Sequence, residues 1–310
     1  MNKLPIWIDT DTGIDDALAI MIACKLEQLD IVGASAVAGN TSLENAFRNC
    51  ADVFNLAGRA DVKVYKGATK PLIGELKTAA GVHGDNGIGG AIIERSKAPI
   101  ETEKAWDAMH KKAKELNKDL TIIAIGPLTN IATTIIKYPD FVEHVKQLNI
   151  MGGAADGGNV SPCAEFNILA DPEAAEIVFK SGMKVNMFGL DVTHKAYLAD
   201  EEVLDLYKID TKAAKLFKDS TSVLLANRKK YYLHGLCQHD STPIVYLVYP
   251  EWFKSEKCGV YVETRGNITR GKTVTDLWSD TKFKERNCEV FLDIDRQKFV
   301  KLIKEILSSY

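Results

Sequence analysis

Four aspartates stand within eight positions near the start of the chain, in the run IDTDTGIDDALAI at residues 8–20. They are Asp9, Asp11, Asp15 and Asp16, and they lie where an apolar strand is expected to end and a helix to begin. Like charges this close raise one another's pKa and destabilise a fold unless a cation or a proton lies between them. Ca²⁺ and Mg²⁺ select hard oxygen ligands, so Asp11 at the strand end and Asp16 in the first helical turn predict a divalent metal site.

Two of these acids have a simpler explanation. Asp15 and Asp16 fall in the first turn of the predicted helix, where each would stabilise the helix dipole by about 0.3–1 kcal/mol. That explanation leaves Asp9 and Asp11 without a role, and the metal site is therefore the favoured interpretation.

Apolar runs alternate with helical patterns along most of the chain. This alternation predicts an α/β fold with an open, mostly parallel sheet covered by helices on both faces. The last part changes to strand-like runs at 258–266, 272–279 and 288–295 and an amphipathic helix at 296–310, which predict a small β and helical C-terminal elaboration. The other predicted strands are 4–8, 30–37, 62–65, 120–125, 145–151 and 184–189, and the helices are 15–29, 42–58, 128–139 and 171–182.

Polar segments follow five of the predicted strands. In an open parallel sheet the ligand site lies beyond the carboxyl ends of the strands. The chain therefore places its chemistry-bearing residues where that rule puts a site, in the segments 9–16, 38–40, 126–130, 151–167 and 190–194.

Composition narrows the class of protein. With 310 residues, 46% hydrophobic and 26% charged, and with no linker-like segment, the sequence predicts a single domain over residues 1–310. A net charge of -3 argues against nucleic acid and anionic membrane as partners. Six scattered cysteines without a Cys-x-x-Cys pair, and no signal or membrane-spanning run, predict a cytoplasmic protein with free thiols.

Two motifs point to other chemistry. GNITRGKT at 266–273 satisfies the phosphate-loop expression, but the following VTDLWSD is β-branched and turn-rich where a helix is needed, so a hairpin turn is predicted instead. IDTDTG is also similar to the D-x-D-x-T start of haloacid-dehalogenase phosphatases, although that pattern does not require Asp15 and Asp16.

Together the motifs resemble one family, from residue 6 to about residue 245: the nucleoside hydrolases of the inosine-uridine-preferring type. The runs that carry the resemblance are DTDTGIDDALA, AGN, VHGDNGIGG, GPLTNIA, MGGAADGGNVSPCAEFNILADPEAA, DVT and HD. The resemblance implies a tightly bound Ca²⁺ held by Asp11, Asp16, Asp240 and the backbone carbonyl of Ile125. It implies ribose binding by Asp15, Asn40, Asn159, Glu165 and Asn167, with Met151 beside the sugar.

The resemblance also places two histidines near the base. His83 and His239 match positions of the non-purine-specific subgroup, and His239 matches the proposed acid for the leaving group. Tyr231, in the run RKKYYLHG, is interpreted either as a base-pocket residue or as part of an amphipathic helix end. Thr12 departs from the usual Pro of the family, and HDSTP at 239–243 replaces the commoner His-Asp-Pro run.

The chemistry expected of such a site is hydrolysis of the N-glycosidic bond of ribonucleosides of the inosine, uridine or cytidine type. The reaction passes through an oxocarbenium-like sugar, and Asp11 would accept the proton of the attacking water. Two alternatives remain: a haloacid-dehalogenase-like phosphatase, and a nucleoside or ribose binding protein without catalysis. The presence of both Asp11 and His239 argues against a pure binder. Relatives form dimers or tetramers, so a homo-oligomer is expected.

Overall fold

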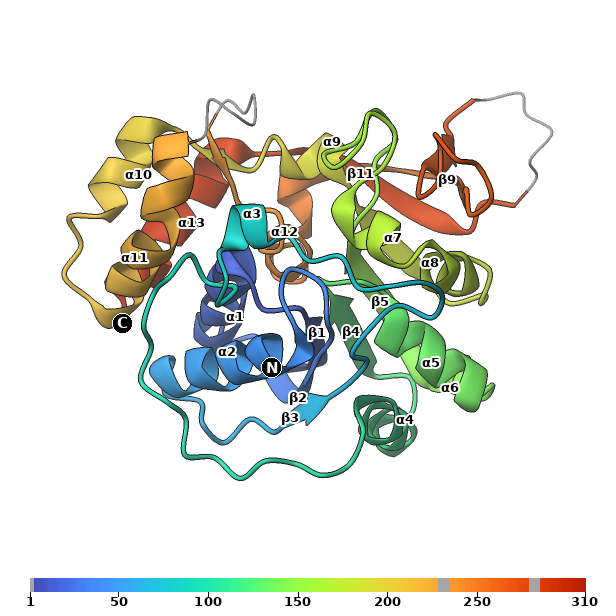
Figure 1. The fold of residues 1–310 in the computed structure, drawn as a ribbon, viewed down its shortest axis with the longest axis horizontal. Helices are drawn as coiled ribbons and strands as arrows, with labels where there is room; N and C mark the ends of the chain where they lie inside the picture. Colours follow the sequence, from blue (N-terminus) through green and yellow to red (C-terminus); the bar gives the residue numbers. More distant parts are fainter. Residues whose placement is uncertain (1–2, 228–234, 279–284) are drawn as a thin grey trace.

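The sheet at the centre of the molecule has nine strands in the order β10-β9-β11-β6-β5-β4-β1-β2-β3. The computed structural model describes residues 3–227, 235–278 and 285–310 (Figure 1). All pairs from β3 to β11 in this order are parallel, whereas β9 runs antiparallel to both β11 and β10. The strands are β1 (Leu4–Thr10), β2 (Leu29–Ala36), β3 (Val64–Lys66), β4 (Leu120–Ala124), β5 (Val145–Met151), β6 (Val185–Phe188), β9 (Phe253–Val262), β10 (Thr273–Asp276) and β11 (Cys288–Ile294).

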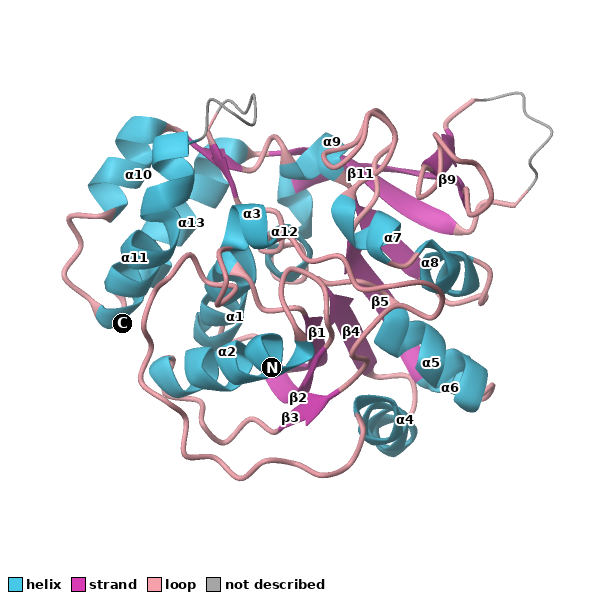
Figure 2. Cartoon of the chain, viewed as in Figure 1, coloured by secondary structure: helices cyan, strands magenta, loops and turns pink. Residues whose placement is uncertain are grey.

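Helices cover both faces of this sheet (Figure 2). Side chains alternate along β1, so that Ile6 and Ile8 face one hydrophobic core and Trp7 faces the other. The Ile8 core contains α1 (Ile14–Lys25), α2 (Leu43–Leu56), α10 (Asp200–Leu206), α11 (Lys212–Asn227) and α13 (Arg296–Ser308), and the Trp7 core contains α4 (Ala105–Leu116), α5 (Thr129–Lys137) and α8 (Pro172–Phe179).

Short elements complete the described part of the chain. They are α3 (Ala80–His83), α6 (Phe141–His144), α7 (Phe166–Ala170), α9 (Leu190–Thr193), α12 (Thr242–Val245), the 3-10 helix Pro250–Trp252, and a two-stranded sheet of β7 (Tyr197–Leu198) and β8 (Leu236–Cys237). Within the described ranges, no helix combines the length and the apolar character needed to cross a bilayer.

The strand order reverses at β1, because β2 lies on one side of it and β4 on the other. A parallel sheet opens a crevice at the carboxyl ends of its strands where the order reverses. Asp11 follows β1 and Ile125 follows β4, so both residues lie at this crevice. The fold therefore brings the first polar segment and the fourth strand's end together.

The predicted α/β fold is confirmed, and the six predicted N-terminal strands are present with ends that differ by at most two residues. The hairpin turn predicted at 266–273 joins the antiparallel strands β9 and β10. The C-terminal strands are part of the main sheet: β11 pairs with β6 in parallel, and β9 and β10 extend the same edge.

Candidate active site

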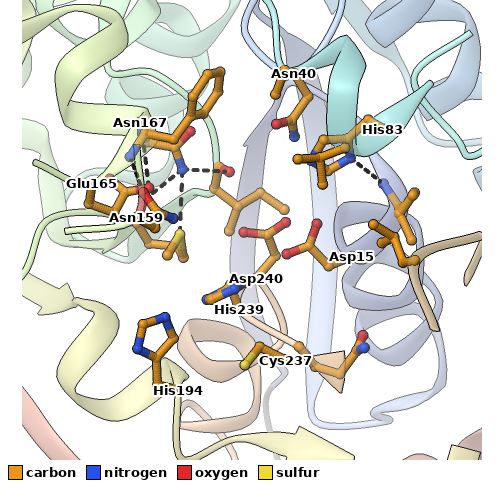
Figure 3. A pocket seen from close by; sticks show the side chains of 18 of the residues that line it. Asp15, Asn40, His83, Asn159, Glu165, Asn167, His194, Cys237, His239 and Asp240 are labelled. Atoms are coloured by element: carbon orange, nitrogen blue, oxygen red, sulfur yellow. Dashed lines mark hydrogen bonds between the residues drawn. The ribbon is translucent and has the colours of Figure 1, made fainter. Parts of the chain in front are cut away.

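A cavity of about 570 Å³ is lined by residues from the segments that follow β1, β2, β4, β5 and β6 (Figure 3). Figure 3 shows Asp15 and Asp240 on one side of it and Asn159, Glu165 and Asn167 on another. Tyr231 lies outside the described residues. The other residues predicted to contact substrate all line the cavity: Asp15, Asn40, His83, Met151, Asn159, Glu165, Asn167 and His239, together with the predicted metal ligands Ile125 and Asp240.

Buried and half-buried carboxylates are concentrated at one end of this cavity. One carboxylate oxygen from each of Asp15, Asp16 and Asp240 lies within 4.8 Å of the others. Burial, with added repulsion from neighbouring acids, raises the pKa of Asp16 to about 6 and raises the pKa of Asp11 and Asp240 well above the ordinary value. Burial also raises the pKa of Asp15 to about 6. Holding these acids together therefore destabilises the fold unless a cation binds between them, as expected for a cation site.

The donor atoms fit a hard divalent cation. Among the residues that the structure describes, buried Oδ1 of Asp11 has no hydrogen-bond partner, whereas its Oδ2 accepts the backbone N–H of Asn40 at 2.6 Å. Every donor in the predicted ligand set is a carboxylate or a carbonyl oxygen, which is the chemistry that Ca²⁺ and Mg²⁺ prefer. The unpartnered Oδ1 is an acceptor that a cation or a water at the site would satisfy.

A network of hydrogen bonds fixes the turn that carries these acids. The Thr10 hydroxyl donates to Oδ1 of Asp16 at 2.6 Å, and the backbone N–H of Thr12 donates to the same hydroxyl at 3.0 Å. Oδ2 of Asp16 accepts the N–H of Gly13 at 2.8 Å and Nδ2 of Asn40 at 3.1 Å. Thr12 thus supplies an N–H that the usual Pro of this position lacks.

Asp9 has a separate environment. Its Oδ1 accepts the hydroxyl of Ser35 and, at 2.7 Å, Nδ2 of Asn130. Burial raises the pKa of Asp9 to about 7, and the two hydrogen bonds oppose that shift. Of the four N-terminal aspartates, Asp9 therefore braces β1 against β2 and α5.

The opposite wall of the cavity is built around Glu165, which caps α7. Its Oε1 accepts the N–H of Asn167 at 2.9 Å, and its Oε2 accepts the N–H groups of Gly153 at 2.9 Å and Ile168 at 3.2 Å. Burial raises the pKa of Glu165 to about 7. Nδ2 of Asn167 donates to the carbonyl of Ile125 at 3.2 Å, which links this wall to the end of β4.

Two histidines line the cavity as neutral groups. Nδ1 of His83 accepts the backbone N–H of Ile14 at 3.1 Å, which places the ring proton on Nε2. Nδ1 of His239 lies 2.8 Å from the hydroxyl of Thr193. Burial lowers the pKa of both rings to about 4, so both are neutral at pH 7.

Comparison with known proteins decides the family. The family model described as inosine-uridine preferring nucleoside hydrolase matches residues 6–301. The chain belongs to this family. A pyrimidine-specific ribonucleoside hydrolase from Photobacterium profundum is 38% identical over 308 residues, covering 99% of each chain, and its namesake from Escherichia coli K12 is 40% identical over 309 residues with the same coverage.

Solved structures give the same answer for this nucleoside hydrolase. A plant nucleoside hydrolase superposes with a TM-score of 0.92 at 33% identity, with 99% of each chain covered. A purine-preferring ribonucleoside hydrolase from Gardnerella vaginalis superposes with a TM-score of 0.91 at 32% identity, with 98% of each chain covered. The chain is therefore a ribonucleoside hydrolase by both sequence and structure.

Several pocket residues of this nucleoside hydrolase were not singled out from the sequence. His194 lines the cavity with its ring 5.7 Å from that of His239, and Phe166 and Cys237 line it as well. Burial raises the pKa of Cys237 to about 12, so its thiol stays protonated. His194 lies in the polar segment predicted after β6 and Phe166 in the one predicted after β5, whereas Cys237 lies outside the predicted polar segments.

Proposed function

We propose that this nucleoside hydrolase releases free base and ribose from pyrimidine ribonucleosides in preference to purine ones, and does so with Ca²⁺. The acidic group beside a cavity with a wall of polar side chains carries the proposal. The full-length relatives at 38% and 40% identity, both named pyrimidine-specific, support the base preference. His83 stands where a purine-stacking tryptophan would indicate the other preference.

The residues proposed to hold Ca²⁺ are Asp11, Asp16, Asp240 and the carbonyl of Ile125. Asp15 lies in the same group and contributes a further carboxylate oxygen. When bound, the cation supplies positive charge that lowers the pKa of a water and orients ribose hydroxyls. The buried, all-oxygen donor set supports this assignment.

Asp11 is proposed to accept the proton of the attacking water. Asn40 occupies Oδ2 of Asp11, so Oδ1 is the oxygen left to accept a proton. A carboxylate oxygen placed beside the attacking water can act as its general base. Removal of this acceptor should therefore lower kcat rather than substrate affinity.

Ribose hydroxyls are proposed to bind Asp15, Asn40, Asn159, Glu165 and Asn167, with Met151 against the sugar. Oε1 of Glu165 has one backbone donor and keeps acceptor capacity for a hydroxyl. A substrate that lacks that hydroxyl leaves a buried carboxylate underbonded, which selects strongly against deoxyribonucleosides.

The departing base is proposed to receive a hydrogen bond or proton from His239. If the Thr193 hydroxyl donates to Nδ1, then Nε2 carries the ring proton that faces the base. A neutral imidazole can act as such a donor. His83, whose proton lies on Nε2, is proposed to contact the base, and Tyr231 keeps its predicted role there.

Three further proposals concern the protein as a whole. The chain acts as one domain, which is supported by a sheet that contains both Leu4 and Ile294. It is proposed to be cytoplasmic and to form a homodimer or homotetramer. Light scattering after size-exclusion chromatography tests the oligomeric state.

The experiment that tests the function measures ribose released from uridine, cytidine, inosine, adenosine and guanosine, with and without prolonged chelation. The controls are 2′-deoxyuridine and uridine 5′-monophosphate. We expect ribose chiefly from uridine and cytidine, little from the deoxy analogue, and loss after chelation. No ribose from a folded, Ca²⁺-loaded protein would contradict the proposal. Phosphate release would then indicate a phosphatase, and nucleoside binding without turnover would indicate a binder.

A further inference from the structure

The segment Gly153–Asp156 lies between β5 and the cavity wall built around Glu165, which we call the sugar-facing wall. Residues that are distant in sequence bind its successive peptide groups. The carbonyl of Gly153 accepts the N–H of Leu190 at 2.9 Å, and its N–H donates to Glu165. The N–H groups of Ala155 and Asp156 donate to the two carboxylate oxygens of Asp191 at 2.7 and 3.1 Å. A segment outside regular structure is thus fixed almost as fully as a strand.

The middle of this segment is bound by the first residue of β10. The hydroxyl of Thr273 accepts the N–H of Ala154 at 2.8 Å and donates to the carbonyl of the same residue at 2.7 Å. Thr273 is 1% exposed, so water does not replace these bonds if the hydroxyl is removed. A Cβ on Gly153, whose φ is +77°, would lie 2.8 Å from the Thr273 side chain. The two segments therefore approach each other at a distance that only glycine permits.

Lys272, which directly precedes β10, also binds this segment. Its Nζ donates to the carbonyl of Ala154 at 3.2 Å and to the carbonyl of Ala155 at 3.0 Å. Asp191 accepts N–H groups of the same segment. The Lys272 ammonium therefore binds carbonyls of Gly153–Asp156, and the Asp191 carboxylate binds its amides. Lys272 and Thr273 close the phosphate-loop-like string GNITRGKT, and here they bind backbone carbonyls and an amide of the chain itself.

One hydrogen bond connects the segment Gly153–Asp156 to the sugar-facing wall. Oε2 of Glu165 accepts the N–H of Gly153, the residue directly before Ala154. A shift of Ala154 moves Gly153 with it, and the carboxylate of Glu165 loses a donor or follows. In Figure 1 the β9 strand and the hairpin to β10, in orange-red, lie beside α7 and α8, on the side of the molecule that carries this wall.

We infer that Lys272 and Thr273 are positioning residues that set where Glu165 meets the ribose. The inference rests on the proposed role of Glu165 in binding a ribose hydroxyl. It gives the C-terminal hairpin, which contributes no side chain to the cavity lining within the described ranges, a part in sugar selectivity. A misplacement of about 1 Å at such a group can cost on the order of 100-fold in rate.

The test compares Thr273→Val with Thr273→Ser and with Thr275→Val. Valine keeps the shape and removes both hydrogen bonds, whereas serine keeps the hydroxyl. Thr275 lies two residues along the same strand, and within the described residues its hydroxyl has no bond to the segment, so it is a matched control. We expect Thr273→Val to lower kcat/KM for uridine about 10- to 100-fold, and Thr273→Ser and Thr275→Val to stay within about threefold.

Selectivity separates positioning from a general loss of structure. The 2′-, 3′- and 5′-deoxy analogues of uridine are assayed with wild type, Thr273→Val and Glu165→Gln. Glu165→Gln identifies the hydroxyl that Glu165 binds, because discrimination against its removal shrinks. We expect Thr273→Val to shrink discrimination at that same hydroxyl and at no other. An unchanged discrimination ratio in Thr273→Val, or an equal change in Thr275→Val, would overturn the inference.

Hydrogen exchange of the peptide spanning residues 152–158 gives a readout that does not depend on turnover. We expect the exchange of these amides to be at least about 10-fold faster in Thr273→Val than in wild type or Thr275→Val. Unchanged exchange would show that Thr273 does not hold the segment. If wild type releases no ribose, the proposed function fails, and exchange still decides whether the hairpin fixes the segment.

Discussion

Residues of one type take different roles according to the strand face and the neighbours they meet. Asp9 lies within β1, and its Oδ1 accepts two side-chain donors, Ser35 and Asn130, whereas Asp11 lies beyond the strand end and its Oδ2 accepts the backbone N–H of Asn40. Among the described residues, each of the two carboxylates keeps one buried oxygen without a hydrogen-bond partner. From the crowding of these aspartates alone, the sequence predicted a single divalent metal site. Crowding alone does not show which side chain turns toward the crevice, because that depends on neighbours far away in the chain.

Asp11→Asn tests the assignment of the base. The substitution keeps the shape and removes the oxygen that would accept a proton, so we expect kcat to fall by about 10³-fold or more. Asp9→Asn is the matched control: it changes an equally buried aspartate two residues away and should keep kcat within about tenfold. Ribose release at saturating uridine measures both. An Asp11→Asn enzyme with near wild-type kcat would show that another group takes the proton.

His239→Ala tests the role of the second histidine at the base. A base that leaves poorly needs a proton donor, so uridine turnover should slow by about 10²- to 10⁴-fold. A p-nitrophenyl riboside carries a leaving group that needs no proton, and its hydrolysis should change less than about tenfold. Equal losses on both substrates would remove the proposed donor role.

Thr193→Val refines this test, because Thr193 contacts the ring of His239 and is not among the described residues that line the cavity. If the hydroxyl fixes the tautomer of His239, we expect a smaller loss with the same dependence on the leaving group. A loss of equal size for both substrates would instead indicate a packing defect.

At the scale of elements, local signals predicted boundaries well where a cap or a proline was present. The helix predicted over 171–182 begins as expected, because Asp171 is a capping residue and Pro172 suits a first helical turn. The Asp171 carboxylate accepts the N–H of Ala174 at 3.1 Å at the start of α8. The stretch between β3 and α4 gave little signal, because its one helix, α3, has four residues and no apolar period. His83 is placed by its bond to Ile14, which joins residues 69 positions apart.

Gly13→Ala tests how α1 and α3 are fitted together. A Cβ on Gly13 would lie 2.4 Å from Nδ1 of His83 and 2.7 Å from Nδ2 of Asn40, so both side chains must move. We expect kcat/KM for uridine to fall about 10- to 100-fold. Gly81→Ala, on the same short helix, is the control, because a Cβ there meets no atom of the described residues within 4 Å. Equal activities of the two variants would show that the contact does not matter.

At the scale of the whole molecule, the sequence predicted the sheet class but not the order of all its strands. A parallel α/β pattern implied a crevice at the carboxyl ends, and the reversal at β1 confirms where it opens. The pairing of β11 with β6 brings in the C-terminal hairpin, and no local pattern encodes that pairing. The contacts of Thr193 with His239 and of Thr273 with Ala154 follow from long-range packing of this kind.

The buried acidic group links metal binding to the stability of the whole molecule. Without a cation, burial and mutual repulsion disfavour the charged forms of these acids, so Ca²⁺ should stabilise the folded state selectively. At a free concentration 100 times its Kd, Ca²⁺ should raise the free energy of unfolding by about 2.7 kcal/mol. Urea denaturation of the chelated protein, with and without added Ca²⁺, measures this gain. Asp240→Asn should remove most of this Ca²⁺-dependent stabilisation, because Asp240 belongs to the acidic group. Asp9→Asn should keep it, because Asp9 lies outside that group. The same unfolding midpoint at every Ca²⁺ concentration would mean that protons, not a metal, keep these carboxylates together.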